Sequence, residues 1–182
     1  MGDIINIKVV LGSMEPLISI GDMVAVMSCN YGDISFGDIV LFRINNKDDF
    51  NNSEEMKGAK YVAHRLIGRT TVNGEKCFLH KGDAAFWGGS RTNESILGKV
   101  ILIRKREYIV DFSENRWKII NFLFAINSFL EYRLVKFSGY IAKILFRRNH
   151  LTFIKKLRPY SLKLKKSFLQ SYYFFTDFVH FK

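Results

Sequence analysis

The sequence predicts a mainly β domain over residues 1–112, followed by a basic, aromatic helical tail over residues 113–182. Two observations lead to this prediction: short strand-like segments fill the first part, and the charge is unevenly placed. The chain has 182 residues, of which 48% are hydrophobic, and this suits one globular domain with an appendage. The first 112 residues carry 14 basic and 14 acidic side chains, so the whole net charge of +11 belongs to the tail.

Six short segments rich in β-branched residues predict strands. They are MVAVMS (23–28), DIVLFRI (38–44), YVAHRLIG (61–68), CFLHKG (77–82), KVILIRK (99–105) and YIVDF (108–112). The pair Asn73-Gly74 predicts a hairpin turn, and the polar stretch 45–60 predicts a surface loop. Strands of this length and spacing indicate an antiparallel or mixed β-domain, either a small barrel or a coiled sheet.

Beyond residue 113 the apolar residues recur every three or four positions, which predicts an amphipathic helix over residues 117–146 with a weak point at Gly139. The apolar stripe consists of Ile119, Leu123, Ile126, Leu130, Leu134, Phe137, Ile141 and Leu145. Polar residues fall on the other side, namely Lys118, Asn121, Ser128, Lys136, Lys143 and Arg147.

Three interpretations of the tail remain open. In the favoured one, the helix lies in the plane of an anionic membrane surface, with basic side chains at the headgroups and aromatic ones such as Trp117 at the interface. In the second, the stripe packs on the β-domain or on a second copy of the chain. In the third, the basic and aromatic segment binds nucleic acid. Because no nucleic-acid-binding motif is present, nucleic acid is the least favoured partner.

Several classes of protein are not indicated by the sequence. The longest uncharged apolar run, residues 119–130, is shorter than the roughly 20 residues that a spanning helix needs. With no secretory signal in the residues before Ser13, we expect membrane association at the cytoplasmic face without a transmembrane segment, or otherwise a cytoplasmic protein. Cys29 and Cys77 are more readily ordinary thiols than a disulfide. No metal spacing or nucleotide-binding motif occurs, so no metal or cofactor is expected.

The stretch GSMEP, residues 12–16, has the residue types expected of a tight turn that exposes a nucleophilic serine. A serine hydroxyl needs a neighbouring base and an exposed position on a tight turn. Gly12 would let a substrate main chain approach, and Pro16 would stiffen the turn. His64, inside the predicted strand YVAHRLIG, is a candidate base, although a histidine in a strand is more often structural.

The combination of segments GSMEPLISIGDMVAV, GDIVLFRI, YVAHRLIGR, HKGDAAF and GKVILIRK, in this order over residues 12–105, resembles the signal peptidase I family of serine proteases. The branch that it resembles uses a histidine base in place of lysine. The resemblance implies Ser13 as nucleophile and His64 as general base. It also matches Asp83 to one of the family's acidic residues, which could orient the imidazole of His64.

The same resemblance implies a signal peptidase/LexA-like β-barrel that cleaves a peptide or preprotein after small residues. Met14, Val24 and Val26 would line the groove for an extended substrate. A LexA-like autoprotease is disfavoured because that group uses a lysine base and needs an arm or DNA-binding domain before the serine. The sequence gives no indication of the substrate's identity or of the oligomeric state.

Two positions depart from the family pattern. Leu11 stands where the family has a small hydroxyl residue that contributes to the oxyanion hole, and losing such a donor costs about 10²- to 10³-fold in rate. Gly89 stands where the histidine branch carries a second aspartate. The alternative function is therefore a catalytically impaired, signal peptidase-like module that binds peptides.

Overall fold

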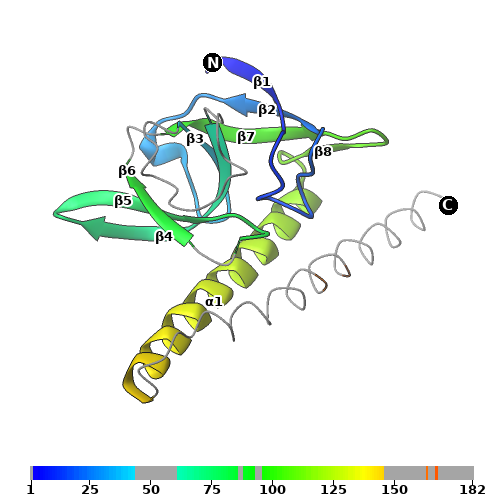
Figure 1. Cartoon of the computed structure of the whole chain (residues 1–182). Helices are drawn as coiled ribbons and strands as arrows, with labels where there is room; N and C mark the ends of the chain where they lie inside the picture. Colours follow the sequence, from blue (N-terminus) through cyan, green and yellow to red (C-terminus); the bar gives the residue numbers. More distant parts are fainter. Residues whose placement is uncertain are drawn as a thin grey trace. The chain divides into compact units, whose positions relative to one another are not determined.

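The computed structural model describes residues 2–43, 61–85, 88–92 and 96–145, together with Lys163 and Ser167. These residues form eight strands, one 3₁₀ helix (η1) and one long α-helix (Figure 1). The elements are β1 (Ile4–Lys8), β2 (Met23–Met27), η1 (Tyr31–Asp33), β3 (Ile39–Arg43), β4 (Tyr61–Val72), β5 (Glu75–Lys81), β6 (Gly88–Thr92), β7 (Ile96–Arg104), β8 (Ile109–Asp111) and α1 (Asn115–Leu145). The prediction of a mainly β domain is confirmed.

The strands form one antiparallel sheet in the order β1-β2-β7-β3-β4-β5-β6, and β8 pairs with β7. The six predicted strand segments correspond to β2, β3, β4, β5, β7 and β8. The prediction missed β1 and β6. The predicted loop 45–60 lies outside the described residues, and so does the tail beyond residue 145 apart from Lys163 and Ser167.

The hairpin between β4 and β5 turns at the predicted position. Asn73 and Gly74 both have positive φ, 52° and 83°, as a two-residue hairpin turn of the primed type requires. The turn fixes the register of the two strands, because Val72 pairs with Glu75 and the ladder continues from there to Arg65 and Lys81. This register decides which side chains of β4 and β5 meet at the far end of the hairpin.

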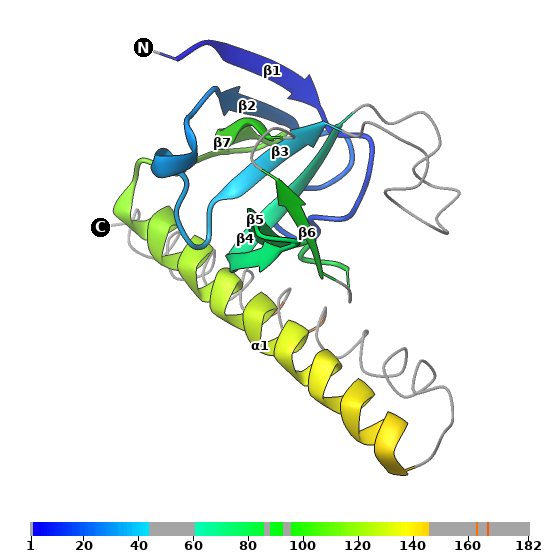
Figure 2. The ribbon, with the colours of Figure 1, turned by 90° about the vertical axis from the view of Figure 1, so that its left-hand side faces the viewer.

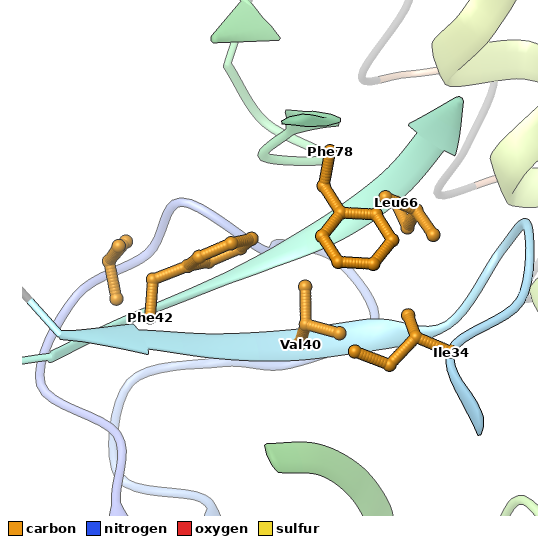
Figure 3. Close-up of a cluster of buried hydrophobic side chains, with 6 residues drawn as sticks. Ile34, Val40, Phe42, Leu66 and Phe78 are labelled. Carbon is orange, nitrogen blue, oxygen red and sulfur yellow. The ribbon is translucent and has the colours of Figure 1, made fainter. Parts of the chain in front are cut away.

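A hydrophobic cluster fills one face of the sheet. Figure 3 shows Val40 and Phe42 of β3, Leu66 of β4 and Phe78 of β5 gathered with Ile34, which precedes β3. All are buried, and Val62 completes the cluster. Since β-strand side chains alternate between the two faces, Val62, His64 and Leu66 of β4 share the face that carries this cluster.

The chain divides into two compact units, Met1–Tyr132 and Arg133–Lys182. The first turns of α1 therefore belong to the unit that contains the sheet, and Figure 2 shows this part of the helix passing beneath β4 and β5. One face of these turns is buried in that unit. Its side chains are Trp117, Ile120, Asn121, Phe124, Ala125 and Ser128.

The predicted apolar stripe is on a different face of α1. Its described members, Ile119, Leu123, Ile126, Leu130, Leu134 and Phe137, are 36% to 65% exposed. The alternative in which the stripe packs on the β-domain is therefore wrong for the members within the first unit. The expectation that Trp117 lies at a membrane interface is also wrong, because this side chain is buried inside the first unit.

Asn121 and Ser128, which the sequence pattern puts on the polar side of the helix, are buried as well. The physical reason is that their polar atoms hydrogen-bond to a charged pair inside the first unit, described below. Helix α1 is not apolar enough over any sufficiently long stretch to cross a membrane, and this holds for every helix in the described residues.

Candidate active site

Ser13 lies half-buried in the turn that connects β1 to β2. The turn is held by its own main chain, because the amide of Glu15 donates to the Gly12 carbonyl at 3.1 Å and the amide of Ile18 donates to Met14 at 3.1 Å. The peptide bond between Glu15 and Pro16 is cis. The serine is thus carried by a compact turn, as the GSMEP sequence predicts.

A second loop, Gly82–Ala85, lies directly against this turn. The amide of Ala84 donates to the carbonyl oxygen of Ser13 at 2.9 Å. A Cβ atom at Gly82 would lie only 2.6 Å from the same oxygen and 3.2 Å from Nε2 of His64. Gly82 is therefore the point at which the Ser13 turn and the His64 ring meet, and a side chain there would force them apart.

The strand register explains why His64 reaches this point. Arg65 of β4 pairs with Lys81 of β5, so continuing the antiparallel ladder by one residue sets Gly82 opposite His64. The imidazole is buried, and it leaves the sheet on the face of the hydrophobic cluster. The fold thus brings the main chain of Ser13 and the ring of His64, 51 positions apart in the sequence, close to the same Cβ position of one glycine, Gly82.

The other ring nitrogen of His64 meets a second histidine. Nδ1 of His64 lies 2.9 Å from Nδ1 of His80, and both rings are buried. His80 pairs with Leu66 across β4 and β5, which makes His64 its diagonal neighbour on the same face. Diagonal neighbours in a sheet are within reach of ring side chains, and the ring of Phe42 packs against His80 with centroids 4.7 Å apart.

The structure places Asp83 on the opposite face, in a buried ion pair with Arg65. Nε of Arg65 donates to Oδ1 of Asp83 at 2.8 Å and Nη2 donates to Oδ2 at 2.6 Å, and both side chains are 0% exposed. The hydroxyl of Ser128 in α1 donates to Oδ1 at 3.1 Å. Asp83 is therefore held by a two-pronged guanidinium bond and by the helix.

Arg65 connects this pair to α1. Its Nη1 donates to the Gly37 carbonyl at 3.0 Å, to the Asn121 carbonyl at 3.1 Å and to Oδ1 of the same asparagine. The side-chain Nδ2 of Asn121 donates in turn to the Gly37 carbonyl at 2.9 Å, and the guanidinium lies over the ring of Phe124. A buried charge needs such partners to be tolerated. The helix thereby fixes the loop that contacts Ser13.

A further ion pair joins the same helix to β5. Nζ of Lys81, fully buried, lies 2.7 Å from Oε2 of Glu131, and it also donates to the Gly82 carbonyl at 3.3 Å. The residue on each side of Gly82 is therefore tied to α1, Lys81 through Glu131 and Asp83 through Ser128. The position of the Gly82 main chain is set from the helix side of the sheet.

No protein-family model, curated protein or solved structure matches the chain.

The predicted substrate-lining residues, Met14, Val24 and Val26, are buried side chains. The strand β2 that carries Val24 and Val26 is paired on both sides, with β1 and with β7. In this structure these three side chains therefore belong to the core and present no surface to a substrate. In the described part of the sheet, β1 and β6 each have a neighbour on one side only.

Sequence reasoning did not assign a site role to His80 or Arg65. The motif FLHKGD shows His80 close to Asp83, but only the hairpin register shows that its ring turns toward His64. Arg65 directly follows His64, and a basic residue within an apolar strand pattern is a signal that a buried acidic partner exists. Among the described residues, no group of three His, Cys, Asp or Glu side chains is arranged to hold a metal ion.

Proposed function

We propose that this protein is a serine endopeptidase of the signal peptidase I type, with Ser13 as nucleophile and His64 as general base. In this proposal the antiparallel sheet is the signal peptidase/LexA-like barrel of that family. One observation supports it most directly: the carbonyl oxygen of Ser13 and Nε2 of His64 both lie close to the same Cβ position of Gly82, at 2.6 Å and 3.2 Å. The order of segments over residues 12–105 adds the resemblance to the family.

The mechanism follows from these two side chains. The Ser13 hydroxyl attacks the carbonyl carbon of a peptide bond while Nε2 of His64 accepts its proton. His64 then donates this proton to the leaving amine, and an acyl-enzyme remains on Ser13. Water, deprotonated by the same imidazole, attacks the ester, and His64 returns this proton to the Ser13 oxygen as the carboxyl product leaves. The substrate is a peptide or leader with small residues before the bond that is cut.

The amide of Ser13 would stabilise the oxyanion that forms on the substrate carbonyl. Leu11 supplies no second side-chain donor, unlike the small hydroxyl residue of the family. The absence of one donor lowers a rate by about 10²- to 10³-fold. We therefore expect slow cleavage, suited to a substrate that is held close to the enzyme.

Part of the proposal concerns the membrane. The stripe on α1 exposes apolar side chains, Ile119, Leu123, Ile126 and Leu130 among them, beside the exposed Lys118. A helix with this composition binds the headgroup region of anionic membranes, and the tail carries the whole net positive charge. We propose that α1 binds the protein to an anionic membrane surface, where a peptide or preprotein substrate is concentrated.

The test combines covalent labelling with cleavage. Wild type, Ser13→Ala and His64→Ala are treated with a fluorophosphonate probe, and the labelled residue is located by mass spectrometry. The same variants are incubated with reporter peptides that carry small residues before the scissile bond, with and without anionic vesicles. Ser28→Ala, at an exposed serine in the loop after β2, is the matched control.

We expect the probe to label Ser13 in wild type and in the Ser28 control, and cleavage to fall by about 10³-fold or more in both site variants. If wild type neither labels nor cleaves, the alternative of an impaired peptide-binding module is favoured. The departures at Leu11 and Gly89 are the observations that favour this second function. It predicts that Ser13→Ala binds the same peptides as wild type.

A further inference from the structure

We propose that His80 is the residue that positions His64, and that it does so by accepting a hydrogen bond from Nδ1–H of His64. The catalytic group is then Ser13–His64–His80, with an imidazole where a serine protease triad has a carboxylate. The inference rests on the proposed function for its catalytic meaning. The hydrogen bond itself is a statement about two buried rings and can be tested without any substrate.

The geometry of the two rings suits a strong hydrogen bond. The two Nδ1 atoms are 2.9 Å apart, whereas the ring centroids are 5.0 Å apart and the ring planes differ by 30°. A short contact between nitrogens with well-separated centroids means that the rings meet edge to edge. An N–H bond and a nitrogen lone pair both lie in the plane of an imidazole ring, so this arrangement points the hydrogen of one ring at the lone pair of the other.

Only one of the two facing nitrogens can carry the hydrogen. If Nδ1 of His64 carries it, Nε2 of His64 is the nitrogen without a hydrogen, and it lies close to Gly82 and the Ser13 turn, as a general base requires. If His80 carries it, Nε2 of His64 is protonated and cannot accept the serine proton. The proposed function therefore requires His80 to be the acceptor.

The same arrangement suits the charged intermediate. When His64 takes the proton of Ser13, both of its nitrogens carry hydrogen, and Nδ1–H still donates to the lone pair of His80. His80 stays neutral throughout and keeps its own hydrogen on Nε2. Because the His80 acceptor is uncharged, it stabilises the imidazolium of His64 less than a carboxylate would.

The fold holds His80 firmly in this position. Its ring packs against Phe42, and its main chain pairs with Leu66 on one side and Gly89 on the other. A Cβ atom at Gly89 would lie 3.2 Å from both Cε1 and Nε2 of His80, so the glycine leaves room for the ring. A side chain fixed by packing and by two neighbouring strands can orient another residue.

Nitrogen-15 NMR of the uniformly labelled full-length chain tests the hydrogen bond directly. Two-bond correlations between the carbon-bound ring hydrogens and the ring nitrogens distinguish protonated from unprotonated nitrogens in each histidine. The spectra are recorded at a pH where the pair is neutral. We expect His64 with its hydrogen on Nδ1 and His80 with its hydrogen on Nε2. The opposite pair of tautomers would overturn the proposal, whether or not the protein cleaves peptides.

Kinetics of two variants test the catalytic role. His80→Leu fills the space but removes the acceptor, whereas the side-chain oxygen of His80→Asn stands close to the position of Nδ1 and can accept from His64. We expect kcat/KM to fall by about 10²- to 10⁴-fold in the leucine variant, with most of the loss recovered in the asparagine variant. Circular dichroism and thermal unfolding establish that both are folded.

A leucine variant as active as wild type would overturn the proposal, and so would equal losses in two folded variants. Failure of the proposed function is recognised separately, because wild type and Ser13→Ala would then be equally inactive. In that case the NMR result alone decides whether His80 is the acceptor.

Discussion

His64 and Arg65 are neighbours in β4, and their side chains leave the sheet on opposite faces. His64 lies with its Nδ1 against His80, on the face of the hydrophobic cluster, whereas Arg65 binds Asp83 on the face that contacts α1. Both reach the loop Gly82–Ala85, His64 at Gly82 and Arg65 at Asp83. One strand therefore supplies the proposed base and, from its other face, the ion pair that holds the loop against Ser13.

The first prediction concerns Asp83, which the family resemblance suggests as the residue that orients His64. In the structure its carboxylate is paired with Arg65, and both are fully buried. Asp83→Asn leaves the guanidinium charge buried without its counter-charge, so we expect the free energy of unfolding to fall by about 3–5 kcal/mol. Urea unfolding followed by tryptophan fluorescence measures the change.

Glu114→Gln is the control for Asp83, because Glu114 pairs with Arg116 where both side chains are 41% exposed. An exposed pair contributes about 0–1 kcal/mol, so this variant is expected to be nearly as stable as wild type. If Asp83→Asn keeps wild-type stability yet loses kcat by about 10⁴-fold, Asp83 orients the base as in a triad, and the structural role is refuted.

The second prediction concerns Gly82. In Gly82→Ala the new methyl group would stand 2.6 Å from the Ser13 carbonyl oxygen and 3.2 Å from Nε2 of His64. The Ser13 turn or the imidazole must move, and a misplacement of about 1 Å costs about 10²-fold in rate. We expect kcat/KM for a reporter peptide to fall by at least this factor.

Gly32→Ala is the matched control for Gly82, because a Cβ atom at Gly32 meets nothing within 4 Å. It should cleave at the wild-type rate. If Gly82→Ala were equally active, Gly82 would not be the contact between the nucleophile and the base, and the proposed site would have to be rejected.

The third prediction concerns the exposed stripe. Leu123→Ser with Leu130→Ser removes two apolar side chains that are 40% and 53% exposed. Because apolar burial in the membrane interface drives binding, we expect co-sedimentation with anionic vesicles to weaken by about tenfold or more. Stability should change by less than about 1 kcal/mol, because exposed positions contribute little to the folded state.

Ile4→Ser with Ile5→Ser is the control for the stripe, since these β1 side chains are similarly exposed, at 54% and 45%. It removes as much apolar surface from another element and should leave vesicle binding unchanged. Equal weakening in both double variants would mean that no particular face binds. Unchanged binding in the stripe variant would refute a membrane role for α1.

The fourth prediction concerns pH. Partial burial raises the pKa of the Cys29 thiol above its ordinary value of 9.0, although the nearby Lys99 acts in the opposite direction. The thiolate is the reactive form, so alkylation by iodoacetamide should be slow at neutral pH and should accelerate only as the pH rises through this raised pKa. The folded state holds the thiol proton more tightly than the unfolded state does. The stability that the protonated Cys29 contributes is therefore present below pH 9.0 and is lost as the pH rises through the raised pKa.

Mass spectrometry of the alkylated protein follows the modification at each pH. Cys29→Ser gives the background, because the remaining Cys77 is buried in the sheet. Rapid labelling of Cys29 at neutral pH would contradict the expected direction of the pKa shift.

The strands that the sequence predicts are those whose signal is carried by apolar residues. The two missed strands have a different origin. β6 reads GGSRT, without an apolar side chain, and it is a strand only because its main chain pairs with β5. β1 reads IINIK, whose three isoleucines favour a strand, but the segment is short, its side chains are almost wholly exposed and it is held by pairing with β2. Pairing with a neighbour, rather than local propensity, decides such strands.

At the site, the sequence indicates the turn with Ser13 and the strand with His64, but not what lies beside them. The polar residues Asn121 and Ser128 look like part of a solvated helix face, because a sequence does not show that an ion pair will need their hydrogen bonds. The pairing of His64 with His80 depends on the register of the hairpin formed by β4, which is 12 residues long, and β5. That register is a property of the fold.

The bonds between the buried face of α1 and the Gly82–Ala85 region have a practical consequence for shortening this chain. A cut at residue 112, where the strand-like part of the sequence ends, would remove the acceptors that Asn121 offers to Arg65, the hydroxyl of Ser128 and the carboxylate of Glu131. The fragment would keep every proposed catalytic side chain and lose the parts that hold the Gly82 loop in place. The smallest piece that retains the whole site ends no earlier than Tyr132, the last residue of the first unit.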